Sequence, residues 1–331
     1  MIASWRAFAS VRFTVVALTA LAALAVGGRL WAALAPAWLA LPAAALVVNL
    51  LAALLTNRRI RARRALAVFH WSLLAFALLL AVSALGRFEG TVEIVEGGAF
   101  DPDAVHVTKR APLAVERVTG VDFVQSSFTV DYLPGLTRRQ LHGTVRVDGA
   151  RRDVSEHGAL DVNGYRFSPT PNKGFAVLLT WRGDRGGSMQ GAVHLPSYPV
   201  YEWRQETTWQ TPAGESVTIA FRPAQRVPMA ASWTFSRARA VGTVTVRTAS
   251  GDAVLAPGSP LRLRGGALVL DDVRLWMGYA IDHDPAMPWL FLAAAVGVLS
   301  LTWHVLREGP AATHARSFRA IGTEGKVLER G

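Results

Sequence analysis

The sequence predicts a membrane protein with four transmembrane α-helices, three before and one after a large extracytoplasmic all-β domain. Apolar residues concentrate at residues 13–56, 65–86 and 288–306. Residues 87–285 instead have the composition of a soluble protein. That central segment is long enough to bury a core of its own. Basic residues flank the apolar stretches, which is the arrangement expected when charge determines orientation in a membrane.

The first three apolar stretches predict transmembrane helices at about residues 13–34, 39–56 and 65–86. Their lengths are close to the roughly 20 residues that a helix needs to cross the hydrocarbon layer. A cleavable signal peptide also begins with basic residues followed by one apolar run. Here a second apolar run follows almost at once, so we expect the first helix to be retained.

A fourth transmembrane helix is predicted at residues 286–308, and the charges then orient all four. Residues 1–12, 57–64 and 307–331 together hold 12 of the 35 basic residues but only three of the 24 acidic ones. Basic segments stay in the cytoplasm. We therefore expect a cytoplasmic N-terminus at residues 1–12, an extracytoplasmic domain at residues 87–285 and a cytoplasmic tail at residues 309–331.

Charge and cysteine content exclude several classes of function. The net charge of +11 comes from the flanks of the apolar stretches, because residues 87–285 hold 22 basic and 21 acidic residues. The charge thus indicates membrane topology, with lipids as neighbours and no nucleic-acid partner. The chain has no cysteine, which excludes disulfides, thiol chemistry and iron–sulfur ligation.

The central domain predicts strands and no helix. Apolar and polar residues alternate in several stretches, and Gly or Pro interrupts the chain every 8–12 residues. This pattern is typical of a β-sandwich or a barrel-like sheet domain. The stretches that alternate most clearly are 91–97, 121–133 and 141–149, and the last of these ends in an Asp-Gly turn.

His70 is the leading candidate for a functional residue. It lies in the third predicted helix, roughly 8 Å inside the membrane from the cytoplasmic side. An ionisable residue within a span is costly and indicates function, and neutral imidazole is a good ligand for haem iron. The alternative is a histidine that only bonds a helix backbone. His304, near the inner end of the fourth helix, is a weaker candidate because it can simply lie among the lipid headgroups.

Other motifs point to structure more than to chemistry. The remaining histidines within the central domain show no metal-ligand spacing, and the chain lacks hydrolase and nucleotide-binding motifs. We expect no catalytic residue. The segment SYPVYEWRQETTWQ, residues 197–210, is interpreted as a strand with cross-strand aromatic pairs, with an aromatic binding strip as the alternative. Asn49, in the second predicted helix, is expected to bond a neighbouring helix.

The layout resembles the ResB family, also called CcsB, of the system II cytochrome c biogenesis pathway. The resemblance rests on the order and spacing of five stretches: ASVRFTVVALTALAAL at 9–24, Phe69 with GRFEGTVEIVEG at 86–97, VDFVQSSFTVDYLPG at 121–135, GALDVNGYRFSPTPNKGF at 158–175, and YAIDHDPAMPWLFLAAAVGVLSL at 279–301. Residues 176–275 match less clearly. The external domain is shorter than in many members.

The resemblance implies that the chain handles haem. It would be a multi-pass protein of the bacterial inner membrane that transiently binds haem b and works with a ResC-like (CcsA-like) partner carrying a tryptophan-rich haem segment. The pair would deliver haem to apocytochrome c outside, where a separate thiol reductant acts on the apocytochrome. The chain would not be an enzyme alone.

The family's membrane histidine falls on His70. The arginines of the cytoplasmic loop would then be able to attract haem propionates, besides determining topology; they are Arg58, Arg59, Arg61, Arg63 and Arg64. The alternative reading is a membrane-anchored scaffold or assembly factor whose external domain binds another protein without haem.

Overall fold

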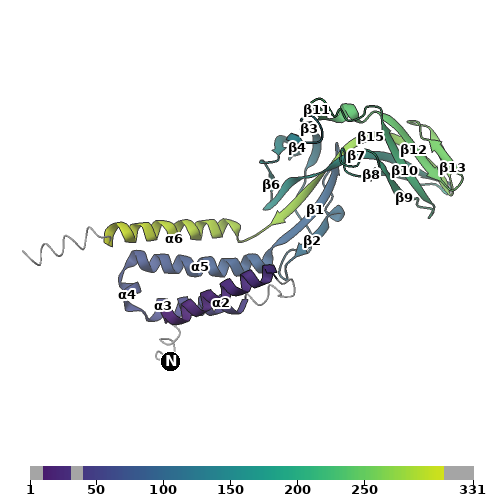
Figure 1. Ribbon diagram of the computed structural model, residues 1–331. Coiled ribbons are helices and arrows are strands. Elements are labelled where there is room, and N and C mark those ends of the chain that lie inside the picture. The colour runs from purple at the N-terminus through teal and green to yellow at the C-terminus, as the bar shows by residue number, and fades with distance from the viewer. Residues whose placement is uncertain (1–9, 31–39, 309–331) are drawn as a thin grey trace, which may run out of the picture. The chain divides into compact units, whose positions relative to one another are not determined.

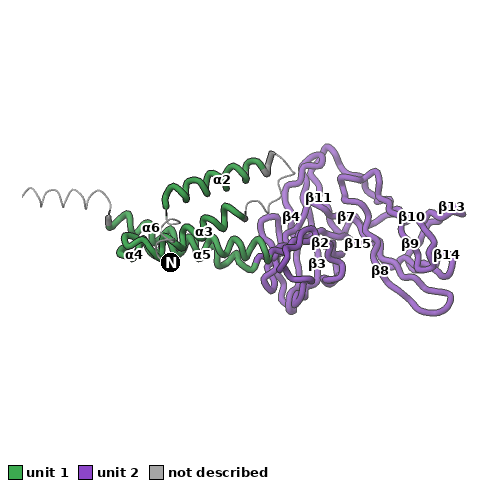
Figure 2. The backbone as a smooth tube through the Cα atoms, turned by 90° about the horizontal axis from the view of Figure 1, so that it is seen from below, with its two compact units in different colours: residues 1–86, 285–331 green, residues 87–284 purple. Residues whose placement is uncertain are grey.

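The structure, a computed structural model, describes residues 10–30 and 40–308. The chain divides into two compact units, residues 1–86 with 285–331 and residues 87–284 (Figure 2). The predicted cytoplasmic N-terminus, residues 1–12, lies largely outside the described residues, and the predicted tail, residues 309–331, lies wholly outside them. Residues 31–34, the end of the first predicted span, also lie outside them.

The first unit is helical. Its described elements are α2 (Val11–Leu30), α3 (Ala40–Thr56), α4 (Arg58–Ala62), α5 (Arg64–Gly86) and α6 (Met287–Glu308). Of these, α5 and α6 are long and apolar enough to cross a membrane. The apolar runs of α2 and α3 are shorter, at Val11–Leu24 and Leu41–Thr56. Two candidate spans are therefore present in the described part of the chain, and the four-span arrangement stays a prediction.

Polar side chains and small residues join these helices in pairs. The Thr14 hydroxyl donates to Asn49 Oδ1 over 2.8 Å, and Asn49 Nδ2 donates to the Ser10 carbonyl over 3.3 Å. The expected bond between Asn49 and a neighbouring helix is thus confirmed. Between α5 and α6, a Cβ atom added at Gly297 would lie 2.7 Å from Ser72 Oγ. A larger residue at this position would force the Ser72 side chain to move, so glycine favours this close approach of the two helices.

The second unit is built on one long antiparallel pair, β7 (Tyr165–Gly183) and β15 (Gly266–His283), visible as the long ribbons of Figure 1. This pair lies in the middle of sheet A, whose strand order is β2-β1-β15-β7-β6, with β14 added to β15 and β8 added to β7. The other strands of sheet A are β1 (Phe88–Val95), β2 (His106–Arg110), β6 (Leu160–Val162), β8 (Ser188–His194) and β14 (Pro260–Leu263).

Two four-stranded sheets accompany sheet A. Sheet B has the order β11-β3-β4-β5 and sheet C has the order β13-β12-β10-β9. Sheet B contains β3 (Val124–Tyr132), β4 (Arg138–Val147), β5 (Ala150–Ser155) and β11 (Trp233–Phe235). Sheet C contains β9 (Glu206–Gln210), β10 (Ser216–Pro223), β12 (Gly242–Thr248) and β13 (Gly251–Val254). Two short 3₁₀ turns, η2 (Pro102–Ala104) and η3 (Arg237–Arg239), complete the unit.

The core of the β unit is where the three sheets meet. Phe175 of β7 is fully buried, and its ring lies 4.9 Å from that of Phe221 in sheet C and 5.3 Å from that of Phe235 in sheet B. Tyr198 closes the cluster at 4.8 Å from Phe175. One buried aromatic residue from each sheet therefore holds the three sheets together.

One sequence-based expectation needs correction, and one strand departs from the usual pattern. The basic segment 57–64 is not simply a loop, because Arg58–Ala62 form α4, whose first turn is capped by the Asn57 side chain accepting from the Arg59 amide. Strand β7 runs for 19 residues and contains Pro169 and Pro171. Its ladder with β15 shifts register between Met277, which pairs with Lys173, and Tyr279, which pairs with Pro169, so Pro171 lies in a bulge where no ladder hydrogen bond is needed.

Candidate functional site

His70 lies in α5 with its ring half-buried against the helical unit. Its Nδ1 is 2.7 Å from the carbonyl oxygen of Leu66, one turn earlier in the same helix. A carbonyl only accepts, so Nδ1 carries the proton in a neutral ring and Nε2 keeps its lone pair. Within the described residues no hydrogen bond involves Nε2. The helix thus orients His70 as a metal ligand is oriented, through its other ring nitrogen.

His304 lies in α6 and is half-buried, with interactions of its own. Helices α5 and α6 are antiparallel, because Gly86 lies near Pro285 while Ser72 lies against Gly297. Counting from that contact, His70 is two residues and His304 seven residues toward the same end of the pair. At 1.5 Å per residue the two histidines differ by about 7.5 Å along the axis. The two histidines therefore lie at different positions along the axis of the helix pair.

The arginine segment is held in place by one apolar side chain. Ile60 is buried in a cluster with Leu54 and Leu74, which belong to α3 and α5. The five arginines around it are all exposed, namely Arg58, Arg59, Arg61, Arg63 and Arg64. No acidic residue occurs in residues 57–64. From Arg64 to His70 the distance along α5 is about 9 Å, so a strongly positive segment lies within about two turns of the histidine.

The histidines of the β unit have structural partners or lie in solvent. His194 Nδ1 is 2.6 Å from Glu93 Oε2, and its ring stacks on Trp276 at 5.5 Å. His283 contacts the Gly164 carbonyl over 2.9 Å and stacks on Tyr165. Across the residues that the structure describes, no three His, Asp or Glu side chains come together as a metal site.

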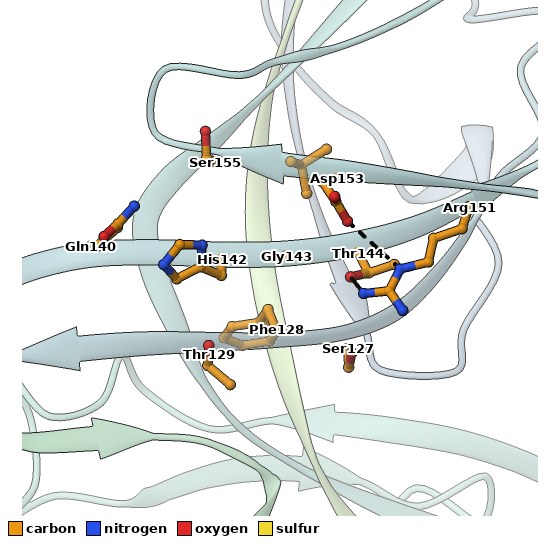
Figure 3. Close-up of a pocket in the computed structure, with 11 residues that line it drawn as sticks. Ser127, Phe128, Thr129, Gln140, His142, Gly143, Thr144, Arg151, Asp153 and Ser155 are labelled. Carbon is orange, nitrogen blue, oxygen red and sulfur yellow. Dashed lines mark hydrogen bonds and ion pairs between the residues drawn. The ribbon is translucent and has the colours of Figure 1, made fainter.

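The outer face of sheet B carries a shallow polar hollow of about 560 Å³ (Figure 3). His142 of β4 is paired across the ladder with Thr129 and Ser155, and the next row pairs Thr144 with Asp153. Arg151 donates to the Thr144 hydroxyl over 3.1 Å. These side chains are short, polar and mostly exposed, as expected of the solvated face of an antiparallel sheet.

A buried carboxylate links sheets A and B. Glu96 accepts from the Phe128 amide over 3.1 Å and lies 4.0 Å from the Arg237 guanidinium, which also pairs with Asp272 over 2.7 Å. Burial raises the pKa of Glu96 above its ordinary value. Burial alone would also raise the pKa of Asp272, but hydrogen bonds from Arg274 and Arg237 lower it. This network connects sheets A and B. The sequence did not predict it, because its charged residues are far apart in the chain.

Lys173 of β7 is a buried lysine beside an aromatic stack. Its ammonium donates to the Pro171 carbonyl over 3.1 Å and lies 5.6 Å from the ring centre of Tyr132. Tyr132 in turn stacks on Trp233 at 4.4 Å. Burial, with a further contribution from Arg138, lowers the pKa of Lys173 from 10.5 to about 8.

This lowered pKa predicts a stability that rises with pH. Above about pH 8 the folded protein releases the Lys173 proton, whereas the unfolded chain keeps it up to its ordinary pKa of 10.5. The unfolded state then binds more protons, so the free energy of unfolding should rise by up to about 1.4 kcal/mol per pH unit. Above about pH 10 the buried tyrosines oppose the rise, because burial raises the pKa of Tyr132, Tyr198 and Tyr279.

The measurement is the urea midpoint of the full chain in detergent at several values from about pH 7.5 to pH 9.5, within the window between those titrations. Lys173→Met should flatten the rise, while Lys109→Met, which changes an exposed lysine of β2, should leave it intact. An equal slope in the wild type and in Lys173→Met would contradict the prediction.

Comparison with known proteins gives little. No protein-family model matches the chain, and no curated protein matches it. Among solved structures the chain is similar to the "Cytochrome c Heme Lyase CcmF", with 14% identity and a TM-score of 0.28. The match covers 88% of this chain and 34% of that one, so the chain spans about a third of that protein's length. A similarity this weak determines neither the fold nor the function.

Proposed function

We propose that the chain is the haem-handling membrane subunit of a system II complex for c-type cytochrome biogenesis, acting with a ResC-like (CcsA-like) partner. Haem b is its cargo, held in transit and passed to the partner, which carries the tryptophan-rich haem segment that this chain lacks. Attachment to apocytochrome c takes place outside the membrane. The subunit positions haem and is not an enzyme alone.

The observation that carries the proposal is the orientation of His70. A histidine within an apolar helix is costly. Its Nδ1 is committed to the Leu66 carbonyl, so Nε2 is the nitrogen available to iron. His304 is a second, weaker candidate ligand. His70 fits the role of a haem ligand, because an imidazole binds iron through the lone pair of one ring nitrogen and Nε2 keeps that lone pair.

The arginine segment supports an approach from the cytoplasmic side. Haem carries two propionates, and guanidinium groups bind carboxylates well. Of the five exposed arginines in residues 58–64, Arg64 lies about 9 Å from His70 along α5. In the proposed orientation, with four spans and both termini in the cytoplasm, that segment faces the cytoplasm and the β unit lies outside. Because the chain has no cysteine, a separate reductant must keep the apocytochrome thiols reduced.

The proposal is tested by reconstitution. The chain, a ResC-like partner and an apocytochrome c are produced together in bacteria that lack their own cytochrome c maturation system, and covalent haem is detected by haem staining after denaturing electrophoresis. Holocytochrome should form only when both membrane proteins are present. Holocytochrome formed equally well without this chain would refute the proposal.

The second candidate is a membrane-anchored scaffold that binds another external protein without haem. It is favoured by Tyr201 and Trp203, which are 46% and 77% exposed and lie in turns where the sequence predicted a strand. Under that reading the complex purifies without haem absorbance, and changes at His70 leave its function intact.

A further inference from the structure

The segment between β2 and β3 returns to the point where the β unit joins α5. Because β2 runs antiparallel to β1, its last residue, Arg110, pairs with Phe88, the first residue of β1. The Ala111 amide then donates to the Arg87 carbonyl over 3.0 Å. Arg87 directly follows Gly86, the last residue of α5. The segment therefore begins within hydrogen-bonding distance of the residue at which the chain leaves a candidate membrane span.

An apolar tip, residues 112–115, projects from this segment. Leu113 is 75% exposed, the highest value among the large aliphatic side chains of the β unit, and Val115 is 37% exposed. The chain on either side of the tip is fixed, because Ala111 and Val118 are buried. The tip thus holds two apolar side chains outward from an anchored segment, and packing within the β unit does not account for them.

Charge does not account for the tip either. Residues 107–117 hold three basic residues and one acidic residue, and Glu89 and Asp103 pair with two of the three bases. The three bases are therefore balanced by three acids. An exposed apolar side chain on its own is common at protein surfaces. Leu113 differs through its place in the chain, beside the end of a helix that is long and apolar enough to cross a membrane.

We propose that the apolar tip inserts into the lipid–water interface of the membrane that α5 crosses. The 23 residues of α5 make a helix about 35 Å long, which just spans the roughly 30 Å of hydrocarbon and leaves Gly86 at a membrane surface. Leu113 is two residues beyond the hydrogen bond to Arg87, at most about 7 Å of chain. Apolar groups of interfacial segments lie about 5–10 Å deep, which is within that reach. The inference rests on the membrane location in the proposed function and not on haem.

The test uses the absence of cysteine, which allows a label at one chosen position. Leu113→Cys, Leu78→Cys and Val254→Cys are each labelled with a nitrobenzoxadiazole fluorophore, and the full chain is reconstituted in phosphatidylcholine vesicles. Leu78 is an exposed residue of α5, and Val254 is an exposed residue of β13, at the other end of the β unit from the start of β1 (Figure 1). Lipids with a spin label near the headgroup should quench the fluorophore at position 113 and shift its emission to shorter wavelength. A spin label deep in the acyl chain should quench position 78 more, and neither should affect position 254.

A second set of variants tests the leucine itself, since the fluorophore is apolar too. The label is placed by Glu116→Cys, at an exposed position next to the tip, and Leu113 is then changed to glutamate. A carboxylate is costly to place in lipid, so Leu113→Glu should lower the quenching by headgroup spin labels. Val241→Glu, the same kind of change at a position 65% exposed ahead of β12, should leave the quenching unchanged.

The outcomes separate the tip from the membrane location. If position 78 is quenched while position 113 is quenched no more than position 254, the proposal is overturned and the membrane location stands. If position 78 is not quenched either, the membrane location fails and the proposal fails with it. Equal loss of quenching in Leu113→Glu and Val241→Glu also overturns the proposal.

Discussion

Under the proposed function, replacing His70 by alanine is expected to remove most of the haem that copurifies with this chain and a ResC-like partner. Changes to groups that only orient a metal ligand already lower metal affinity by roughly 10- to 100-fold. Loss of the ligand itself should therefore cost at least about tenfold. The measurement is the Soret absorbance per mole of purified complex, recorded in membranes or detergent for the wild type and the variant.

Three further variants make this experiment specific. His70→Gly leaves a space in which added imidazole should restore part of the absorbance, which a folding defect would not allow. His304→Ala tests the weaker candidate separately, since the two histidines are about 7.5 Å apart along the helix pair. His157→Ala changes an exposed histidine of the β unit and should have no effect. Unchanged haem content in His70→Ala would remove the ligand assignment and favour the scaffold.

Replacing Phe175 by alanine is expected to destabilise the β unit by about 3–5 kcal/mol, the usual cost of removing a buried phenylalanine. The residue is 0% exposed and its ring contacts Tyr198, Phe221 and Phe235. The cavity would open where three sheets meet, so little collapse around it is expected. The measurement is pulse proteolysis of the full chain in urea, which reports the fraction unfolded.

Two control variants make this prediction specific. Phe175→Leu keeps most of the volume and should cost clearly less than the alanine variant. Leu113→Ala, at a position 75% exposed, should change the midpoint very little. If Phe175→Ala were as stable as Leu113→Ala, Phe175 would not be the junction of the three sheets.

Local patterns were enough to predict much of the fold. The alternation in residues 141–149 predicted β4 (Arg138–Val147), and its Asp-Gly turn is present as Asp148 and Gly149, both with positive φ. Apolar length predicted α5 and α6, because membrane spanning depends on a sum over one helix and not on contacts. Even so, the prolines of β7 hid its full length, since only the register with β15 shows where the bulge falls.

By itself the sequence determined which segments are apolar, which alternate, where the arginines cluster and that His70 lies within an apolar helix. These are properties of neighbouring residues along one chain. The tertiary structure alone decided that Lys173 and Glu96 are buried, and that Tyr198 enters the core while Trp203 stays in solvent. Such outcomes depend on contacts between residues far apart in the chain, which no local pattern records.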